Sequence, residues 1–138
     1  MKILVDTSVW SLALRKKKLT KKEQSIVDEF TEIIRELRVS IIGPIRQDLL
    51  SGISDNEKFH LLKDKLQSFE DYSITQNDYE TAAELSNICR RNGVQGSHID
   101  FLICSVAINN DFSVFTTDKD FNNYKKHIGI KLHQIREA

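Results

Sequence analysis

The sequence predicts an α/β fold in which helices cover both faces of a short, mainly parallel sheet. The first reason is the run at 3–5, three aliphatic residues without polar alternation, which is typical of a parallel strand buried on both faces. The second is that short apolar runs alternate with longer segments of helical periodicity. The third is size, because 138 residues with 40% hydrophobic content suit a single domain, 1–138, with its own core.

The first half of the chain is predicted to hold two strands and four helices. Thr20 suits the cap of the second helix, Pro44 the first turn of the third, and Gly52 its carboxyl-terminal cap. Periodicity supplies the remaining limits. The expected elements are a strand at 3–5, a helix at 9–14, a helix at 20–37, a strand at 39–42, a helix at 45–51 and a helix at 59–69.

The second half continues the alternation. The segment 99–108 is apolar nearly all round and therefore predicts a buried helix, and Asn92-Gly93 ends the helix before it. One proline and five glycines in the whole chain imply short loops. The expected elements are a strand at 72–74, a helix at 77–91, a helix at 99–108, a strand at 112–116, a helix at 118–124 and a strand at 128–132.

Composition excludes several classes of protein. The formal net charge is zero, so the chain as a whole has no charge-driven affinity for nucleic acid or acidic membranes. Cys89 and Cys104 lie among apolar residues without zinc-motif spacing, and we expect both to be small buried side chains. No stretch reads as a signal peptide or a membrane span, so we expect no membrane association and a cytoplasmic location.

Carboxylates recur where an open α/β sheet places its chemistry, just beyond the carboxyl ends of its strands. Asp6 directly follows the first strand and Asp118 follows the fourth. Taken alone, Asp6 is more simply a turn or capping aspartate. Asp48 shares a face of its short predicted helix with Ile45 and Leu49, so its carboxylate is expected to point with apolar residues rather than away from them.

Two further acids have capping alternatives. Asp100 stands third in its helix after Ser97, which fits a capping box, and that position also holds a carboxylate ionised in the helix dipole. Asp120 stands three residues after Thr117, and capping is its preferred role. Thr7, Ser8 and Thr117 are expected either to cap helices or to orient the acids and hold waters.

Gathered at one edge, Asp6, Asp48, Asp100 and Asp118 would repel one another. Two carboxylates ~6 Å apart repel by roughly 3 kcal/mol at an effective dielectric near 20. A cation between them removes that cost, and oxygen ligands favour a hard ion such as Mg²⁺ or Mn²⁺. Such an ion lowers the pKa of water and orients a phosphate, which is chemistry for cutting phosphodiester bonds.

Along nearly its whole length the chain resembles the PIN-domain ribonucleases, and among them the VapC toxins of prokaryotic type II toxin–antitoxin pairs. The segments that carry this resemblance are 4–10, 42–52, 100–107 and 116–121. It implies a three-layer α/β/α sandwich, an acidic pocket for Mg²⁺ or Mn²⁺, and RNA cleavage by metal-activated water. It also implies a small VapB-like antitoxin as partner and a homodimer.

The same resemblance assigns roles to the acids. Asp6, Asp100 and Asp118 match the acidic positions and are the expected metal ligands. Asp48 stands where a glutamate is usual and, being one methylene shorter, is expected to reach the metal through water. We therefore expect Asp6, Asp48, Asp100 and Asp118 to be the catalytic set.

RNA that approaches these acids needs basic residues nearby. The densest basic run is Arg15, Lys16, Lys17 and Lys18, and the hypothesis is that it contacts the RNA backbone, although such a run is more often simply a solvated face. Arg46 is expected either to contact the scissile phosphate or to pair with Asp48.

Two alternatives stay open and two fail. The open alternatives are an RNA-processing PIN nuclease without a toxin role and a catalytically inactive binding module of the same fold. A receiver domain or an Asp-x-Asp phosphotransferase does not fit, because Asp6 has no second acid beside it and Ser8 stands where one is needed.

Overall fold

The computed structural model describes residues 1–136, in which five strands form one sheet in the order β3-β2-β1-β4-β5. Every neighbouring pair of strands is parallel. The strands are β1 (Ile3–Val5), β2 (Val39–Ile42), β3 (Asp71–Tyr72), β4 (Ser113–Phe115) and β5 (Lys131–Leu132). The helices are α1 (Thr7–Leu14), α2 (Lys21–Arg35), α3 (Gly43–Leu50), α4 (Asn56–Leu66), α5 (Gln76–Arg91), α6 (His98–Asn110) and α7 (Asp120–Lys125).

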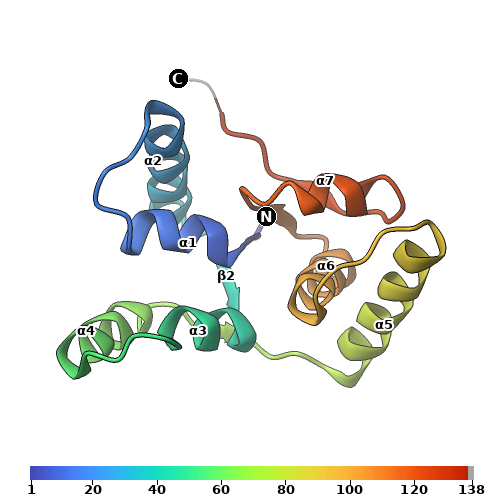
Figure 1. The fold of residues 1–138 in the computed structure, drawn as a ribbon, viewed down its shortest axis with the longest axis horizontal. Coiled ribbons are helices and arrows are strands. Elements are labelled where there is room, and N and C mark those ends of the chain that lie inside the picture. Colours follow the sequence, from blue (N-terminus) through green and yellow to red (C-terminus); the bar gives the residue numbers. More distant parts are fainter. Residues whose placement is uncertain (137–138) are drawn as a thin grey trace.

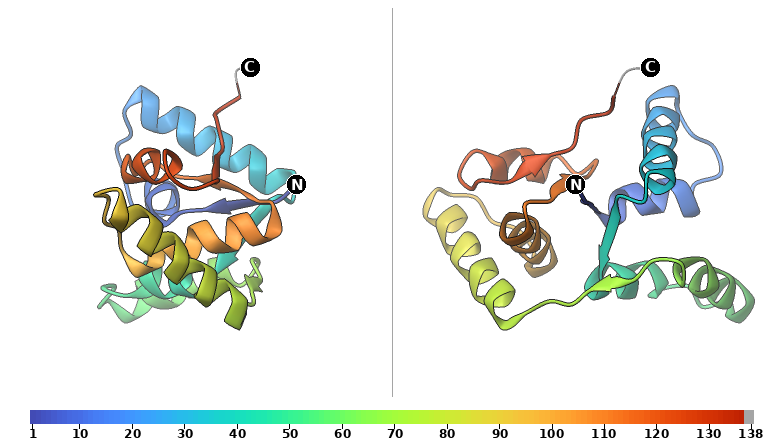
Figure 2. Two further views of the ribbon diagram at one scale, coloured as in Figure 1. Left: turned by 90° about the vertical axis from the view of Figure 1, so that its right-hand side faces the viewer. Right: turned by 180° about the vertical axis from the view of Figure 1, so that it is seen from behind.

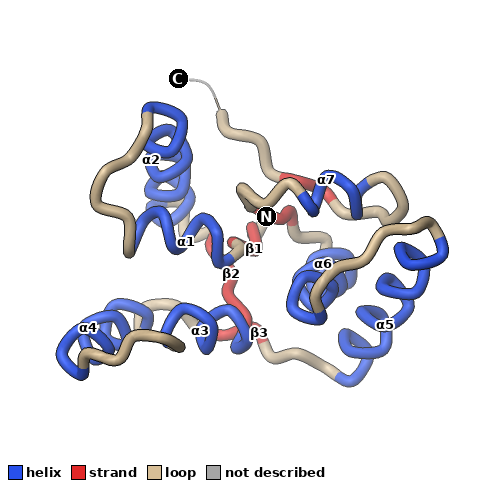
Figure 3. Tube along the Cα trace, viewed as in Figure 1, coloured by secondary structure: helices blue, strands red, loops and turns tan. Residues whose placement is uncertain are grey.

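Helices lie on both sides of this sheet, as the alternation of elements predicted. Helices α1 to α4 lie on one side of the strands, whereas α5 and α6 pack together on the other (Figures 1 and 3). The view from behind gives the same division, with α7 beside the β4–β5 edge (Figure 2). The three-layer α/β/α sandwich is therefore confirmed.

The central strand β1 marks the point where the chain changes direction across the sheet. From β1 the chain runs outward to β2 and β3, then crosses back to β4 and β5 on the other side. Val5 of β1 stands opposite Phe115 of β4. In open α/β sheets the crevice beyond the carboxyl ends of two such neighbouring strands is the usual place for a ligand.

Burial follows the sequence pattern closely. Ile3, Leu4 and Val5 are fully buried, which accounts for their lack of alternation. Trp10 donates its indole N–H to the Val5 carbonyl at 3.1 Å and packs edge-on against Phe30 with ring centroids 4.8 Å apart. The α1–α2 side of the core is thus tied directly to β1.

The predicted helices all form; the ends at Leu14 and Arg91 are confirmed, and the other ends are shifted. Asp55 caps α4 by accepting the backbone N–H groups of Glu57 and Lys58, so this helix begins three residues before Phe59. Pro44 lies in the first turn of α3, which begins at Gly43 rather than Ile45. The predicted strand at 72–74 is displaced, since β3 pairs with β2 through Asp71 and Tyr72.

Both cysteines are buried and form no disulfide, and burial raises the pKa of the Cys89 thiol. Among residues 1–136, no helix combines the length and apolar character needed to cross a bilayer.

Candidate active site

The carboxylate of Asp6 lies at the carboxyl end of the central strand and is held there by two hydroxyl groups. Its Oδ2 accepts hydrogen bonds from Ser8 Oγ and Thr116 Oγ1, both at 2.8 Å. Asp6 occupies the position before α1, yet its side chain makes no capping bond. The plain capping interpretation of Asp6 is therefore wrong, and its buried carboxylate, 7% exposed, is held by side chains instead.

Thr116 joins the loops that follow β1 and β4. Besides donating to Asp6, its hydroxyl oxygen accepts the backbone N–H of Asp118 at 3.0 Å. Ser8 makes the matching link, because its Oγ accepts the N–H of Thr117 at 3.0 Å. Sequence reasoning missed Thr116, which it placed inside the predicted strand 112–116, whereas β4 ends at Phe115 and leaves Thr116 just beyond the strand.

Asp100 enters the site from the first turn of α6. Ser97 caps this helix as predicted, its Oγ accepting the Asp100 N–H at 3.1 Å. The Asp100 carboxylate is bonded elsewhere, with Oδ2 accepting the phenol O–H of Tyr124 at 2.7 Å. Burial raises the pKa of Asp100, and the charges of Asp6 and Asp118 raise it further, against the lowering effect of the Tyr124 bond.

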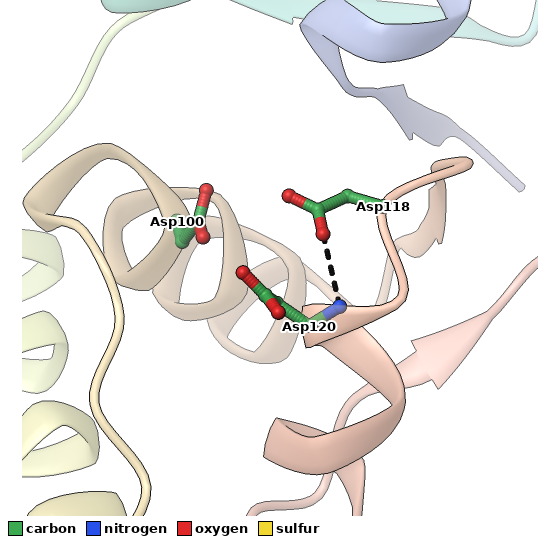
Figure 4. A group of neighbouring side chains, drawn as sticks. All are labelled: Asp100, Asp118 and Asp120. Carbon is green, nitrogen blue, oxygen red and sulfur yellow. Dashed lines mark hydrogen bonds between the residues drawn. The ribbon is translucent and has the colours of Figure 1, made fainter.

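Three carboxylates converge at this edge of the sheet. Asp100, Asp118 and Asp120 each offer an oxygen atom, and these atoms lie within 4.8 Å of one another (Figure 4). They come from α6, the loop after β4 and the start of α7 (Figure 4). Of the acids expected to gather, Asp100 and Asp118 therefore belong to this group and repel each other, and Asp120 lies with them.

The predicted capping role of Asp120 is wrong. Instead of a box with Thr117, the Asp118 Oδ1 accepts the Asp120 N–H at 2.9 Å (Figure 4), and α7 has no side-chain cap. This bond fixes the loop, and the Asp120 carboxylate lies with the other acids.

The three carboxylates of Asp100, Asp118 and Asp120, called the acid group below, suit a hard divalent cation. Within residues 1–136, none of Asp6, Asp100, Asp118 and Asp120 forms an ion pair with a basic side chain. Their negative charge is thus not balanced by the described protein, and all the available donor atoms are oxygens. Oxygen-only sites favour Mg²⁺ or Mn²⁺ over zinc.

Asp48 does not share the buried face of its helix. Ile45 and Leu49 are fully buried in α3, whereas Asp48 is exposed. The expectation that its carboxylate points with the apolar residues is wrong, because the eight-residue helix is rotated so that Asp48 lies outside the buried stripe. Asp48 is also not part of the group formed by Asp100, Asp118 and Asp120.

Arg46 has a structural role that the sequence did not suggest. Its Nε donates to Asp71 Oδ1 at 2.9 Å, and its two terminal nitrogens donate to the carbonyls of Leu66 and Phe69. Arg46 thereby ties α3 to the end of α4 and to β3. It does not pair with Asp48, and these bonds already use the guanidinium that was expected to contact RNA.

Two of the four basic residues at 15–18, which follow α1, are bonded within the protein. The Arg15 guanidinium donates to the Leu49 carbonyl, and Lys16 pairs with Glu23 at 2.6 Å. Lys17 and Lys18 are exposed and follow directly. Thr7, predicted to support the acids, is the half-buried first residue of α1.

Comparison with known proteins gives one family and several similar folds. The family model described as "PIN domain" matches residues 3–127. No curated protein matches the chain.

The similar solved structures are distant in sequence. FitAcB from Neisseria gonorrhoeae is 18% identical with a TM-score of 0.76, covering 96% of each chain. VapBC2 from Rickettsia felis, bound to a promoter DNA fragment, is 18% identical with a TM-score of 0.77, covering 96% of this chain and 98% of that one. A toxin–antitoxin complex from Klebsiella pneumoniae is 15% identical with a TM-score of 0.64, covering 87% and 90%.

Proposed function

Because this chain belongs to the PIN domain family, we propose that it is a divalent-metal-dependent endoribonuclease and the toxin of a type II toxin–antitoxin pair. The observation that carries the proposal is the group of Asp100, Asp118 and Asp120 carboxylates without basic partners in residues 1–136, next to the buried Asp6. Mutual repulsion of this kind is tolerated where a cation is bound.

In this proposal Asp6, Asp100 and Asp118 hold Mg²⁺ or Mn²⁺, and Asp120 joins them. The ion supplies Lewis acidity toward a phosphate and lowers the pKa of water. The protein's own part is orientation. Ser8 and Thr116 fix the Asp6 carboxylate, and the Thr116 hydroxyl fixes the loop that carries Asp118.

The substrate is proposed to be RNA, with Lys17 and Lys18 contacting its phosphates. Both are exposed, and phosphate contacts by lysine supply affinity without sequence preference.

The partner is proposed to be a VapB-like antitoxin, and the nuclease a homodimer. Support for the partner comes from two of the similar structures, one named as VapBC2 and the other as a toxin–antitoxin complex. Light scattering on the purified protein, alone and with the product of an adjacent small gene, tests both statements.

The direct test is cleavage of a mixed RNA pool by purified protein in Mg²⁺, in Mn²⁺ or in chelator. Wild type and the matched control Asp64→Asn, which removes an exposed carboxylate on α4, should cut RNA only with metal. Asp100→Asn and Asp118→Asn should lose at least about 100-fold in rate, the order of one transition-state charge interaction. Cleavage that survives chelator, or both substitutions, would contradict the proposal.

The exposed position of Asp48 favours one alternative, a catalytically inactive binding module. Asp48→Glu lengthens this side chain by one methylene and distinguishes an active nuclease from an inactive binding module. A folded wild type that cuts no RNA in either metal, and is not activated by Asp48→Glu, would support the binding module.

A toxin also differs from a processing enzyme in living cells. Induced expression of wild type in a bacterial host should arrest growth, and Asp100→Asn should not. Active protein that leaves growth unchanged would support the RNA-processing alternative.

A further inference from the structure

Tyr124 is a buried side chain whose one polar atom reaches the acid group. The residue lies in α7 and is 0% exposed. Its phenol donates to Asp100 Oδ2 at 2.7 Å. The Ser97 side chain, which caps the same helix, also lowers the pKa of Asp100, but less than the Tyr124 phenol does. The phenol therefore restricts rotation of the Asp100 carboxylate.

The ring of Tyr124 is held from several sides. Phe101 of α6 and Phe121 of α7 pack against it, with ring centroids 5.0 Å and 5.2 Å away. These aromatic contacts fix the direction of the phenol O–H.

Gly96 makes room for this arrangement. A Cβ atom at position 96 would lie 2.7 Å from Tyr124 Cζ and 2.9 Å from Phe101 Cε2, and would overlap the Tyr124 hydroxyl oxygen. These are rigid aromatic atoms in a packed layer, so a larger residue at 96 must displace the phenol. The loop before α6 thus admits only glycine if the bond between Tyr124 and Asp100 is to form.

We propose that Tyr124 is a positioning residue that holds the Asp100 carboxylate in its metal-binding orientation, and that Gly96 serves the same end by leaving space for the phenol. The inference rests on the proposed function, because it takes Asp100 to be a metal ligand. Hydrogen bonds to ligating carboxylates fix their orientation, and their loss typically costs 10–100-fold in metal affinity.

The test is Mn²⁺ affinity, measured by isothermal titration calorimetry without RNA. Tyr124→Phe keeps the ring and removes only the hydroxyl, and it should raise the Kd for Mn²⁺ by about 10-fold or more. The matched control is Tyr72→Phe, which removes a phenol bonded to Asp78 at 3.2 Å, away from the acid group, and it should leave the Kd unchanged. Thermal unfolding of each variant establishes that it is folded.

Gly96→Ala supplies the second test. Alone, this substitution should weaken Mn²⁺ binding as Tyr124→Phe does. Combined with Tyr124→Phe, it should add no further loss, because no hydroxyl remains to be displaced.

Three outcomes would overturn the inference. They are a wild-type Kd in Tyr124→Phe, an equal loss in Tyr72→Phe, and additive losses for Gly96→Ala and Tyr124→Phe. A wild-type protein that binds no Mn²⁺ would instead overturn the proposed function on which the inference rests.

Discussion

At the scale of single residues, the buried carboxylate of Asp6 and the half-buried carboxylate of Asp100 are stabilised very differently. Asp6 receives two short hydroxyl bonds on one oxygen. Asp100 receives one phenol, and burial together with the charges of Asp6 and Asp118 raises its pKa. Ionised Asp100 therefore destabilises the folded protein whenever no cation is bound, as is common for groups kept for function.

We expect Asp100→Asn to raise the melting temperature in chelator at pH 7 by roughly 3 °C. Folding raises the pKa of Asp100 above its ordinary value of 3.8, so the metal-free wild type loses stability as pH rises through and above that value. The amide is uncharged at every pH and can still accept the Tyr124 hydrogen bond. Differential scanning calorimetry measures the difference.

The control for this prediction is pH itself. Below pH 3.8 the carboxyl is protonated in both states, so wild type and variant should melt together. A variant that melts below wild type in chelator at pH 7 would contradict the argument.

Sequence reasoning located the acids but not the groups that hold them. Strand ends identified Asp6 and Asp118, and the capping position identified Asp100. Thr116 and Tyr124 escaped because their partners lie 110 and 24 residues away, and no local pattern says which hydroxyl meets which carboxylate. Asp48 was misplaced because a short helix leaves its rotation undetermined by apolar spacing.

At the scale of elements, Asp78 joins β3, α5 and α6 through one buried carboxylate. It is 1% exposed and accepts the Thr75 N–H at 2.9 Å, the Asn109 amide at 2.8 Å and the Tyr72 phenol at 3.2 Å. Burial alone would raise the pKa of Asp78, but these bonds hold it below its ordinary value. One side chain thus caps α5 and also fixes its packing on α6.

We expect Asp78→Asn to lower the free energy of unfolding by about 1–3 kcal/mol at pH 7, because a neutral amide cannot accept all three bonds. Urea unfolding measures the loss, with the exposed Asp28→Asn on α2 as the control.

The pH dependence of this loss has a definite sign. Folding depresses the pKa of Asp78, so its stabilisation is full above 3.8 and is lost as pH falls through the lower folded value. The difference in the free energy of unfolding between wild type and Asp78→Asn should therefore decrease as the pH is lowered. A gap that is constant down to pH 2 would refute the assignment.

Helix existence was predictable here, but only some helix ends were, such as Leu14, Arg91 and the Thr20 cap. Periodicity identified α2 and α5, and a continuous apolar run identified α6. The start of α4 is set by its cap, Asp55, and several other polar residues in the same loop could have capped the helix equally well as judged from the sequence. Strand β3 is displaced because its two residues carry almost no pattern, and only its pairing with β2 sets its register.

At the scale of the whole molecule, zero net charge conceals an uneven distribution. The acid group lies beyond the carboxyl ends of β1 and β4, where an anionic substrate would be repelled unless cations balance it. Lys17 and Lys18 offer exposed positive charge without a bond to the described chain, unlike Arg15 and Lys16 before them.

We expect the double variant Lys17→Ala/Lys18→Ala to weaken RNA binding and to flatten its salt dependence. Each lost contact to a single-strand phosphate should reduce the slope of log affinity against log salt by about 0.7. Fluorescence anisotropy in an Asp118→Asn background measures binding without cleavage. The control is Lys2→Ala, at the amino end of β1, which should leave the slope unchanged. An unchanged slope in the double variant would refute the contact between these lysines and RNA.

The fold class was predictable from patterns that span the whole chain, namely the buried first strand and the alternation after it. The strand order was not, because parallel strands of two or three residues look alike in sequence. Only the fully buried β1 indicates which of them is central.

The position of β1 at the centre of the sheet also decides when the candidate site can be completed during synthesis of the chain. β1 emerges first, but its neighbour β4 spans 113–115, and Thr116 and Asp118 come later still. The ribosome adds roughly 5–20 residues per second, so the site is incomplete for most of the time taken to make the chain. If the chain has the proposed nuclease activity, that activity therefore arises only when translation is almost finished.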